Sequence, residues 1–168
     1  LRDEKDSLRT AYAVRDLPEK SRIRVLHLGQ AHDADWAARA RAEMAVNPRY
    51  HWFGEVPRWR VRRIMSRSRA MVLSSVMEGG ANVISEAVAG GLPVIASDIS
   101  GSVGLLGDDY GGYYPVGDTA GLAGVLSRIE AEPKFLAQLN WQCRAREKLF
   151  TPARERAALK KLLDGLAP

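Results

Sequence analysis

Residues 78–98 of the chain are EGGANVISEAVAGGLPVIASD, and they predict a loop, a helix and a strand in that order. The apolar positions after Asn82 recur at helical spacing, which indicates a helix with one buried face. Gly90-Gly91 ends that helix, and Pro93 prevents its return before an apolar run of strand length. Another short apolar run, residues 70–73, precedes this stretch, which predicts a strand that ends just before the loop.

The loop at the start of this stretch carries two glycines, Gly79 and Gly80. Glycine permits unusual backbone dihedrals and lets the backbone come close to a ligand. The helix that follows exposes N–H groups that have no intrahelical partner, which makes a site for a phosphate or another anion. The segment therefore predicts an anion-binding helix N-terminus at the carboxyl end of a strand.

Two glutamates accompany the start of the helix, Glu78 in the loop and Glu86 two turns along. A carboxylate at Glu86 can accept hydrogen bonds from vicinal hydroxyls such as those of a ribose, while Glu78 faces whatever lies over the loop. The same residues also fit a capping device and a solvated helix position. Their spacing alone does not separate the two interpretations.

Short apolar runs alternate with helical patterns along the rest of the chain. Strands are predicted near residues 22–28, 50–54, 70–74, 93–97 and 113–116. This alternation indicates an α/β fold, a Rossmann-like parallel sheet with helices on both faces, in which ligands bind beyond the carboxyl ends of the strands. We expect residues 1–168 to form a single domain, because a chain of this length with 46% apolar residues can bury a core.

Three local predictions accompany this fold. Asp33 or Asp35 is expected to cap the helix that ends at Val46. His27 lies inside an apolar strand and is expected to be a core or edge histidine rather than a base. Residues 99–110 are expected to form a glycine-rich loop.

The overall composition narrows the classes of function. A net charge of +5 favours anionic ligands such as sugar nucleotides, but it also suits nucleic acid or an acidic membrane surface. The single Cys143 excludes an internal disulfide, so we expect a cytoplasmic protein. No run approaches the roughly 20 apolar residues that span a bilayer. No Walker loop or metal-ligand pairing is present, and Gly29 lacks the further glycines of a dinucleotide fingerprint.

The segment from Arg58 to Arg69 contains six arginines in twelve residues. Val61, Ile64 and Met65 lie at helical spacing within it, which predicts a helix with a core stripe and an arginine-rich outer face. A solvated face explains the arginines, and the alternative is an anionic partner, a membrane surface or another domain. Nucleic acid is disfavoured, because the arginines lack the repeated aromatic interleaving that would stack on successive bases.

The spacing of Glu78 and Glu86, followed by Ala-x-x-x-Gly-x-Pro-Val-x-Ala-Ser at residues 87–97, resembles a known family. It is similar to the nucleotide-sugar-binding half of the family 4 glycosyltransferases of GT-B fold, and the likeness extends over nearly the whole chain. The sequence EGGANVISEA at residues 78–87, together with GSVGLLGDDY at residues 101–110, resembles the bacterial selenosugar synthase group more closely still. That group makes a sugar selenide during selenoneine biosynthesis.

The resemblance implies roles for particular residues around the helix start. It implies that Glu78 contacts the donor sugar and that Glu86 contacts the ribose of the nucleotide. It places the following loop and first helical turn against the sugar and diphosphate, namely Gly79, Gly80, Ala81, Asn82 and Val83.

Further contacts are implied elsewhere in the chain. Lys5 matches by position a lysine that neutralises the donor diphosphate, and Arg2 stands in for a family arginine, although a solvated loop charge fits Arg2 too. The turn of Gly54, Glu55 and Val56 resembles the segment under the uracil, although an ordinary strand-to-helix turn fits it as well.

The function implied is retaining transfer from a UDP-sugar, with UDP-N-acetylglucosamine as the favoured donor and selenophosphate as the acceptor of the selenosugar group. Glu78 and Lys5 are the expected catalytic residues, and neither a metal nor another cofactor is expected. The resemblance also implies an N-terminal acceptor domain and a central first strand, both absent from this chain. The fragment is therefore expected to be inactive alone, and we expect either a gap beside the strand at residues 22–28 or the supply of that strand from outside the chain. The alternative function is a non-enzymatic module that binds a sugar nucleotide or a polyanion.

Overall fold

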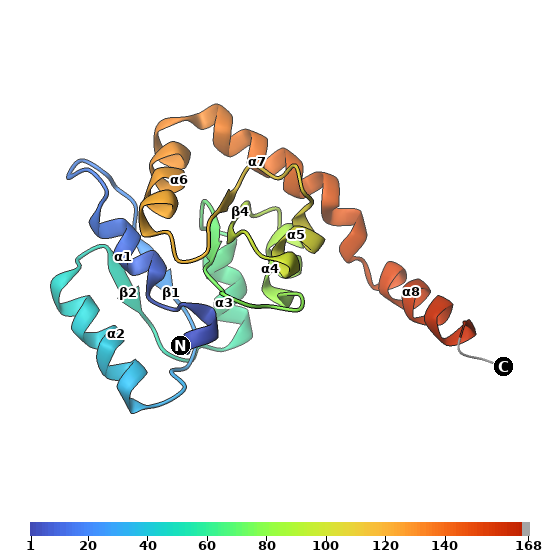
Figure 1. The fold of residues 1–168 in the computed structure, drawn as a ribbon, viewed down its shortest axis with the longest axis horizontal. Coiled ribbons are helices and arrows are strands. Elements are labelled where there is room, and N and C mark those ends of the chain that lie inside the picture. Colours follow the sequence, from blue (N-terminus) through green and yellow to red (C-terminus); the bar gives the residue numbers. More distant parts are fainter. Residues whose placement is uncertain (166–168) are drawn as a thin grey trace.

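Parallel strands lie between helices in the computed structural model, which describes residues 1–165 (Figure 1). Each of the five strands falls within a predicted range and is shorter than that range. The strands are β1 (Val25–His27), β2 (Tyr50–Trp52), β3 (Met71–Leu73), β4 (Val94–Ser97) and β5 (Tyr113–Tyr114). The α/β class and the Rossmann-like arrangement predicted from the sequence are therefore confirmed.

Helices connect the strands and cover the sheets. They are η1 (Asp3–Lys5), α1 (Arg9–Arg15), α2 (Ala34–Val46), α3 (Arg58–Met65), α4 (Asn82–Ala89), α5 (Ser100–Leu106), α6 (Thr119–Ala131), α7 (Pro133–Arg146), η2 (Glu147–Phe150) and α8 (Pro152–Asp164). Asp33, one of the two predicted caps of α2, accepts a hydrogen bond from the Trp36 N–H at 2.9 Å. Helix α8 projects beyond the rest of the domain (Figure 1).

The strands form two separate parallel sheets rather than one. One sheet holds β1 and β2, with Val25 opposite Tyr50, and the other has the order β3-β4-β5. Within the described residues, β1 and β3 each pair on one edge only and are not hydrogen-bonded to each other. The expected gap beside the strand at residues 22–28 is confirmed.

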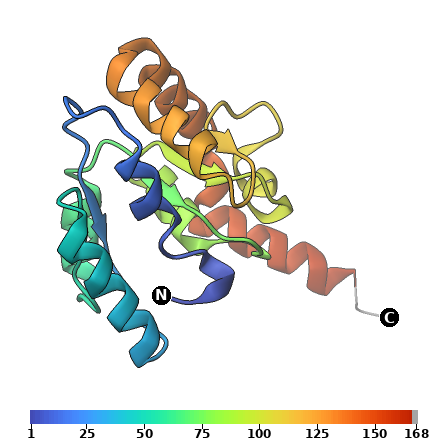
Figure 2. The same ribbon diagram turned by 60° about the vertical axis from the view of Figure 1, so that its left-hand side comes forward.

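The first residues of the chain join the carboxyl ends of the two sheets. The Leu1 carbonyl accepts a hydrogen bond from His32 N–H, after β1, at 2.9 Å, and the Glu4 carbonyl accepts one from Val76 N–H, after β3, at 2.8 Å. Figure 2 shows this segment in blue, between the first sheet and the green strands of the second. Both sheets therefore end at one common edge, as the strands of a single parallel sheet would.

The larger of two apolar clusters surrounds the second sheet. All four residues of β4 are buried, and the fully buried side chains of Ile84 and Val88 in α4 and Leu122 in α6 pack in the same cluster. A smaller cluster around Trp36 and Tyr50 lies at the first sheet. The loop after β3 is therefore supported by the larger of the two apolar clusters.

One sequence prediction is wrong, and another holds only in part. Residues 100–106, expected within a loop, form helix α5 despite two glycines. The reason is tertiary: Gly101 packs against the Glu78 backbone so closely that an added Cβ would lie 2.1 Å from the Glu78 carbonyl oxygen. In α3, the expected core stripe is only half-buried, and no residue of that helix is fully buried.

None of the helices in residues 1–165 combines the length and the apolar content needed to cross a membrane.

Candidate functional site

The loop after β3 brings two predicted site residues together at the common carboxyl edge. The Lys5 ammonium contacts Glu78 Oε1 directly, although the residues are far apart in sequence. The Ser75 hydroxyl donates to the same oxygen at 3.1 Å. The Ser74 hydroxyl anchors η1 beside this pair by donating to the carbonyls of Lys5 at 2.9 Å and Asp6 at 3.0 Å.

Lys5 is partly buried and lies among charges of both signs. Partial burial lowers the pKa of Lys5, Arg2 nearby lowers it further, and Glu4 opposes the change. Contact with the Glu78 carboxylate favours the charged ammonium. The Nε atom of Arg2 lies 3.9 Å from Oε2 of Glu4, and the Arg2 side chain is more than half exposed. Lys5 is therefore the cation built into the site, and Arg2 is a nearby surface charge.

Gly79 and Gly80 do not have the unusual dihedrals that were predicted, because neither residue has a positive φ. A Cβ built at either glycine meets no atom within 4 Å, so open space lies over the backbone at this point. The pair thus leaves room for a close approach to the backbone beside Glu78.

Helix α4 begins at Asn82, as predicted, with Ala81 as its N-cap residue. No side chain caps this helix start, and within residues 1–165 the N–H groups of Asn82 and Val83 have no hydrogen-bond acceptor. Such N–H groups and the positive end of the helix dipole favour an anion at this position. The helix start therefore adds a second source of positive potential beside Lys5.

Glu86 lies on the exposed side of α4, one turn after the helix start. Among the described residues its carboxylate forms neither a hydrogen bond nor an ion pair. The carboxylate is thus accessible, which suits either a ligand hydroxyl or solvent.

The turn after β2 ends at the same edge of the fold. Position 54 favours glycine because its φ is +65°. The Gly54 carbonyl accepts a hydrogen bond from the Gly29 N–H at 2.8 Å. Glu55 is exposed and Val56 is half-buried before α3 begins. The backbone of this turn is held by β1, while its side chains contribute no ion pair within the described part of the chain.

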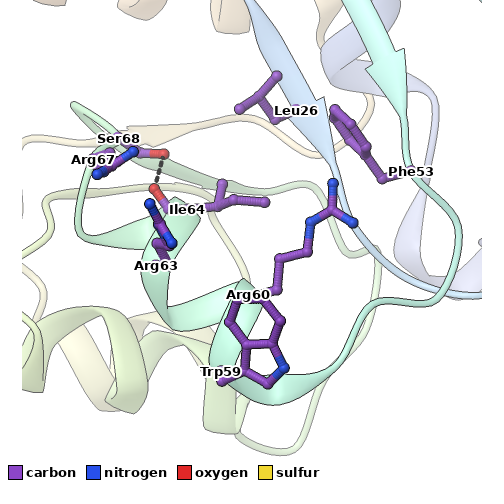
Figure 3. A pocket seen from close by; sticks show the side chains of 8 residues that line it. All are labelled: Leu26, Phe53, Trp59, Arg60, Arg63, Ile64, Arg67 and Ser68. Atoms are coloured by element: carbon purple, nitrogen blue, oxygen red, sulfur yellow. Dashed lines mark hydrogen bonds between the residues drawn. The ribbon is translucent and has the colours of Figure 1, made fainter.

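Helix α3 borders a cavity of about 390 Å³ next to β1 and β2 (Figure 3). Apolar and basic side chains line it together, namely Leu26, Phe53, Trp59, Arg60, Arg63, Ile64, Arg67 and Ser68. The Arg60 guanidinium lies 5.7 Å from the centre of the Phe53 ring. Within residues 1–165 no arginine of the Arg58 to Arg69 segment forms an ion pair, so this surface is strongly positive.

Sequence reasoning missed Ser75 as a site residue. The only available signal was its place at the end of an apolar strand, three residues before Glu78. The remaining site residues come from three separated segments, which meet because parallel strands end at one edge.

The fold defined by these strands and helices matches solved structures of GT-B glycosyltransferases. The HepE protein of Anabaena in complex with UDP-glucose aligns with 98% of this chain at a TM-score of 0.83 and 18% identity, over 46% of its own length. Sucrose-phosphate synthase of Thermosynechococcus elongatus aligns with 98% of the chain at 0.76 and 25% identity, over 44% of its length. WaaG, a glycosyltransferase involved in lipopolysaccharide biosynthesis, aligns with 92% of the chain at a TM-score of 0.74 and 21% identity, over 43% of its own length.

The family model of the group 1 glycosyl transferases matches residues 4–131, which is well over half of the chain. The chain therefore belongs to the group 1 glycosyl transferase family. The match includes Lys5, Glu78 and Glu86, and Arg2 lies just outside it. No curated protein sequence matches the chain. The chain spans less than half the length of the structures named above.

Proposed function

We propose that this chain is the donor-binding half of a retaining family 4 glycosyltransferase that takes a UDP-sugar. The observation that carries the proposal is the contact between Lys5 and Glu78 at the sheet edge, beside an uncapped helix start. A lysine and free backbone N–H groups suit a diphosphate, and a fixed carboxylate suits the hydroxyls of a sugar. The HepE protein, whose fold this chain shares, is known in complex with UDP-glucose.

In the proposed mechanism, the positive groups of the site act on the leaving group. Lys5 and the N–H groups of Asn82 and Val83 stabilise the charge that develops on the departing diphosphate, and Arg2 adds a more distant charge. Glu78 positions the donor sugar over Gly79 and Gly80. These groups supply positive charge without a metal, so no metal or other cofactor is part of the proposal.

The nucleoside is assigned to the two remaining parts of the site. Glu86 is exposed and accepts hydrogen bonds from the ribose hydroxyls. The backbone of the turn formed by Gly54, Glu55 and Val56 lies under the uracil.

The domain organisation is part of the proposal. The gap between β1 and β3 has parallel strands on both sides, and the segment that starts at Leu1 joins their carboxyl ends. A strand that precedes Leu1 would therefore complete the sheet, and residues 1–168 would be one domain beside an N-terminal acceptor domain. The share of the related structures that the chain covers, 43–46%, supports this division.

The finer assignment rests on sequence resemblance. UDP-N-acetylglucosamine is proposed as the donor, selenophosphate as the acceptor and the cytoplasm as the location, following the selenosugar synthase group. Because the acceptor site would lie in the other domain, the isolated chain is expected to bind donor without catalysing transfer.

Calorimetric titration with UDP, ADP and GDP tests the proposal on this chain directly. We expect UDP to bind at least tenfold more tightly than the other two nucleotides, with UDP-N-acetylglucosamine preferred to UDP-glucose. No binding, or equal binding of all three nucleotides, would contradict the uridine assignment.

A non-enzymatic polyanion-binding module remains the second candidate, because the arginines of α3 have no carboxylate partner within residues 1–165. That function predicts base-independent binding that weakens steeply with salt. Replacing Arg60 and Arg63 by glutamine would abolish such binding, whereas it would leave UDP binding at the Lys5 site unchanged.

A further inference from the structure

Glu78 is held in place by contacts that the proposed function does not assign. Ser75 is fully buried, and its hydroxyl donates to Glu78 Oε1 at 3.1 Å. Lys5 contacts the same oxygen. Within residues 1–165 Oε2 forms no hydrogen bond or ion pair, so one carboxylate oxygen is bound by the protein and the other remains for a ligand.

The backbone that carries Ser75 is itself fixed by the next strand. Ser97, at the end of β4, is fully buried, and its hydroxyl donates to the Ser75 carbonyl at 2.5 Å. Strand β4 pairs on both edges, with β3 and β5, so it is a rigid support. Strand β4 therefore holds Ser97, Ser97 holds the Ser75 backbone, and the Ser75 hydroxyl holds the Glu78 carboxylate.

The Glu78 backbone has a third support from α5. A Cβ on Gly101 would lie 2.1 Å from the Glu78 carbonyl oxygen and 2.9 Å from its carbonyl carbon. Helix α5 therefore touches the Glu78 backbone directly. The side chain and the backbone of Glu78 are each held from a different element.

We propose that Ser75 and Ser97 are positioning residues that fix the orientation of the Glu78 carboxylate and present Oε2 to a donor hydroxyl of the sugar. The inference rests on the proposed function, since it concerns the same site. If Ser75 served only to satisfy a buried backbone group, its hydroxyl would not need to donate to the Glu78 carboxylate at the carboxyl edge of the sheet. The orientation matters for the sugar and not for the UDP moiety, whose diphosphate is held by other groups.

The test measures UDP release from UDP-N-acetylglucosamine by the full-length protein, with selenophosphate or water as the acceptor. We expect Ser75→Ala to lower kcat by about tenfold to a hundredfold, as loss of a hydrogen bond to a charged group does, with UDP affinity within threefold of wild type. Ser97→Ala is expected to change kcat in the same direction by a smaller factor. A change in KM with kcat intact would overturn the inference.

Ser102→Ala is the matched control. Ser102 is also fully buried, but its hydroxyl has no hydrogen-bond partner among the described residues. The same substitution there removes no carboxylate contact, and we expect kcat and UDP affinity to stay at the wild-type values. An equal loss of kcat in Ser102→Ala and Ser75→Ala would mean that both act through the fold.

A double-mutant cycle separates positioning from a general structural effect. In a Glu78→Ala background, Ser75→Ala should change kcat by less than twofold, because the carboxylate through which it acts is gone. A further tenfold loss in that background would overturn the inference. If Ser75→Ala does not fold, Ser97→Ala takes its place in the cycle.

The outcomes also separate this inference from the proposed function. Full activity of Ser75→Ala and Ser97→Ala, with activity lost in Glu78→Ala, would contradict the positioning role alone. Failure of the wild-type protein to bind UDP or to release it from the donor would contradict the proposed function itself.

Discussion

The two sheets of this domain differ in how completely their strands are covered. Strand β4 has partners on both edges and is buried along its whole length, whereas β1 has one partner and leaves Leu26 at 44% exposure. Helix α3, beside β1, has no fully buried residue, and Trp59 on it is 65% exposed. Both β1 and β3 have an unpaired edge within the described residues, but the sheet that supports the Glu78 loop is buried around β4, whereas the other sheet is partly exposed beside an arginine-rich helix.

The largest expected effect comes from filling the gap between β1 and β3 with the proposed strand. Adding the strand that is proposed to precede Leu1 should raise the free energy of unfolding by about 5 kcal/mol, because a central strand buries several apolar side chains. Urea denaturation measures the change. An extension with a proline at its centre is the control, since proline cannot pair in a central strand. Equal stability of both extensions would contradict the gap as a strand site.

Matched isoleucines in the two regions give the next effect. Ile84 in α4 is fully buried, and Ile64 in α3 is only half-buried beside the cavity. We expect Ile84→Ala to lower the free energy of unfolding by about 3–4 kcal/mol and Ile64→Ala by about 1 kcal/mol or less. Denaturant midpoints measure both. Equal losses would mean that the two regions are equally well packed.

Acid should weaken the first sheet through His27. Burial lowers the pKa of His27 to about 4, and its Nδ1 lies 2.9 Å from the Tyr50 hydroxyl, as expected for a core or edge histidine rather than a base. Because the unfolded chain takes up the proton near pH 6.5, the unfolded state binds more protons, and stability falls as pH drops from about 6.5 to 4. The loss amounts to about 3 kcal/mol.

The control for this prediction is His27→Gln, which keeps a hydrogen-bond acceptor for the Tyr50 hydroxyl and does not titrate. Urea unfolding of both proteins between pH 7 and 4 isolates the histidine from the carboxylates, which titrate in both. The variant should lose less stability than the wild type across that range. Identical pH profiles would rule out His27 as the cause.

Much of the fold follows from local sequence signals. The strands are short apolar runs, α4 lies between a loop and a glycine pair, and Asp33 caps α2, so each can be predicted from neighbouring residues. Helix α5 could not be predicted in this way, because Gly101 favours a loop unless its contact with the Glu78 backbone is known. The apolar stripe of α3 was predicted correctly as a helix face, but its poor burial depends on the open edge of β1.

The site depends even more on contacts that are distant in sequence. No spacing rule links Lys5 to Glu78, and only the family resemblance placed them in one site. Ser75 and Ser97 look like ordinary serines at the ends of apolar strands, and their roles depend on the pairing of β3 with β4. The separate contacts proposed for Glu78 and Glu86 stay predictions, since the structure gives their exposure and partners but no ligand.

The UDP affinities of Glu86→Ala and Glu78→Ala, measured by calorimetry against the wild type, test the central claim most directly. Glu86→Ala should weaken UDP binding by about 1–3 kcal/mol, because it removes a charge-assisted contact with the ribose. Glu78→Ala should leave UDP affinity within a few-fold of wild type, since its proposed partner is the sugar and Lys5 remains for the diphosphate. If both variants bind UDP as the wild type does and the full-length protein still transfers sugar, the glutamates are a loop contact and a solvated residue, and the account is contradicted.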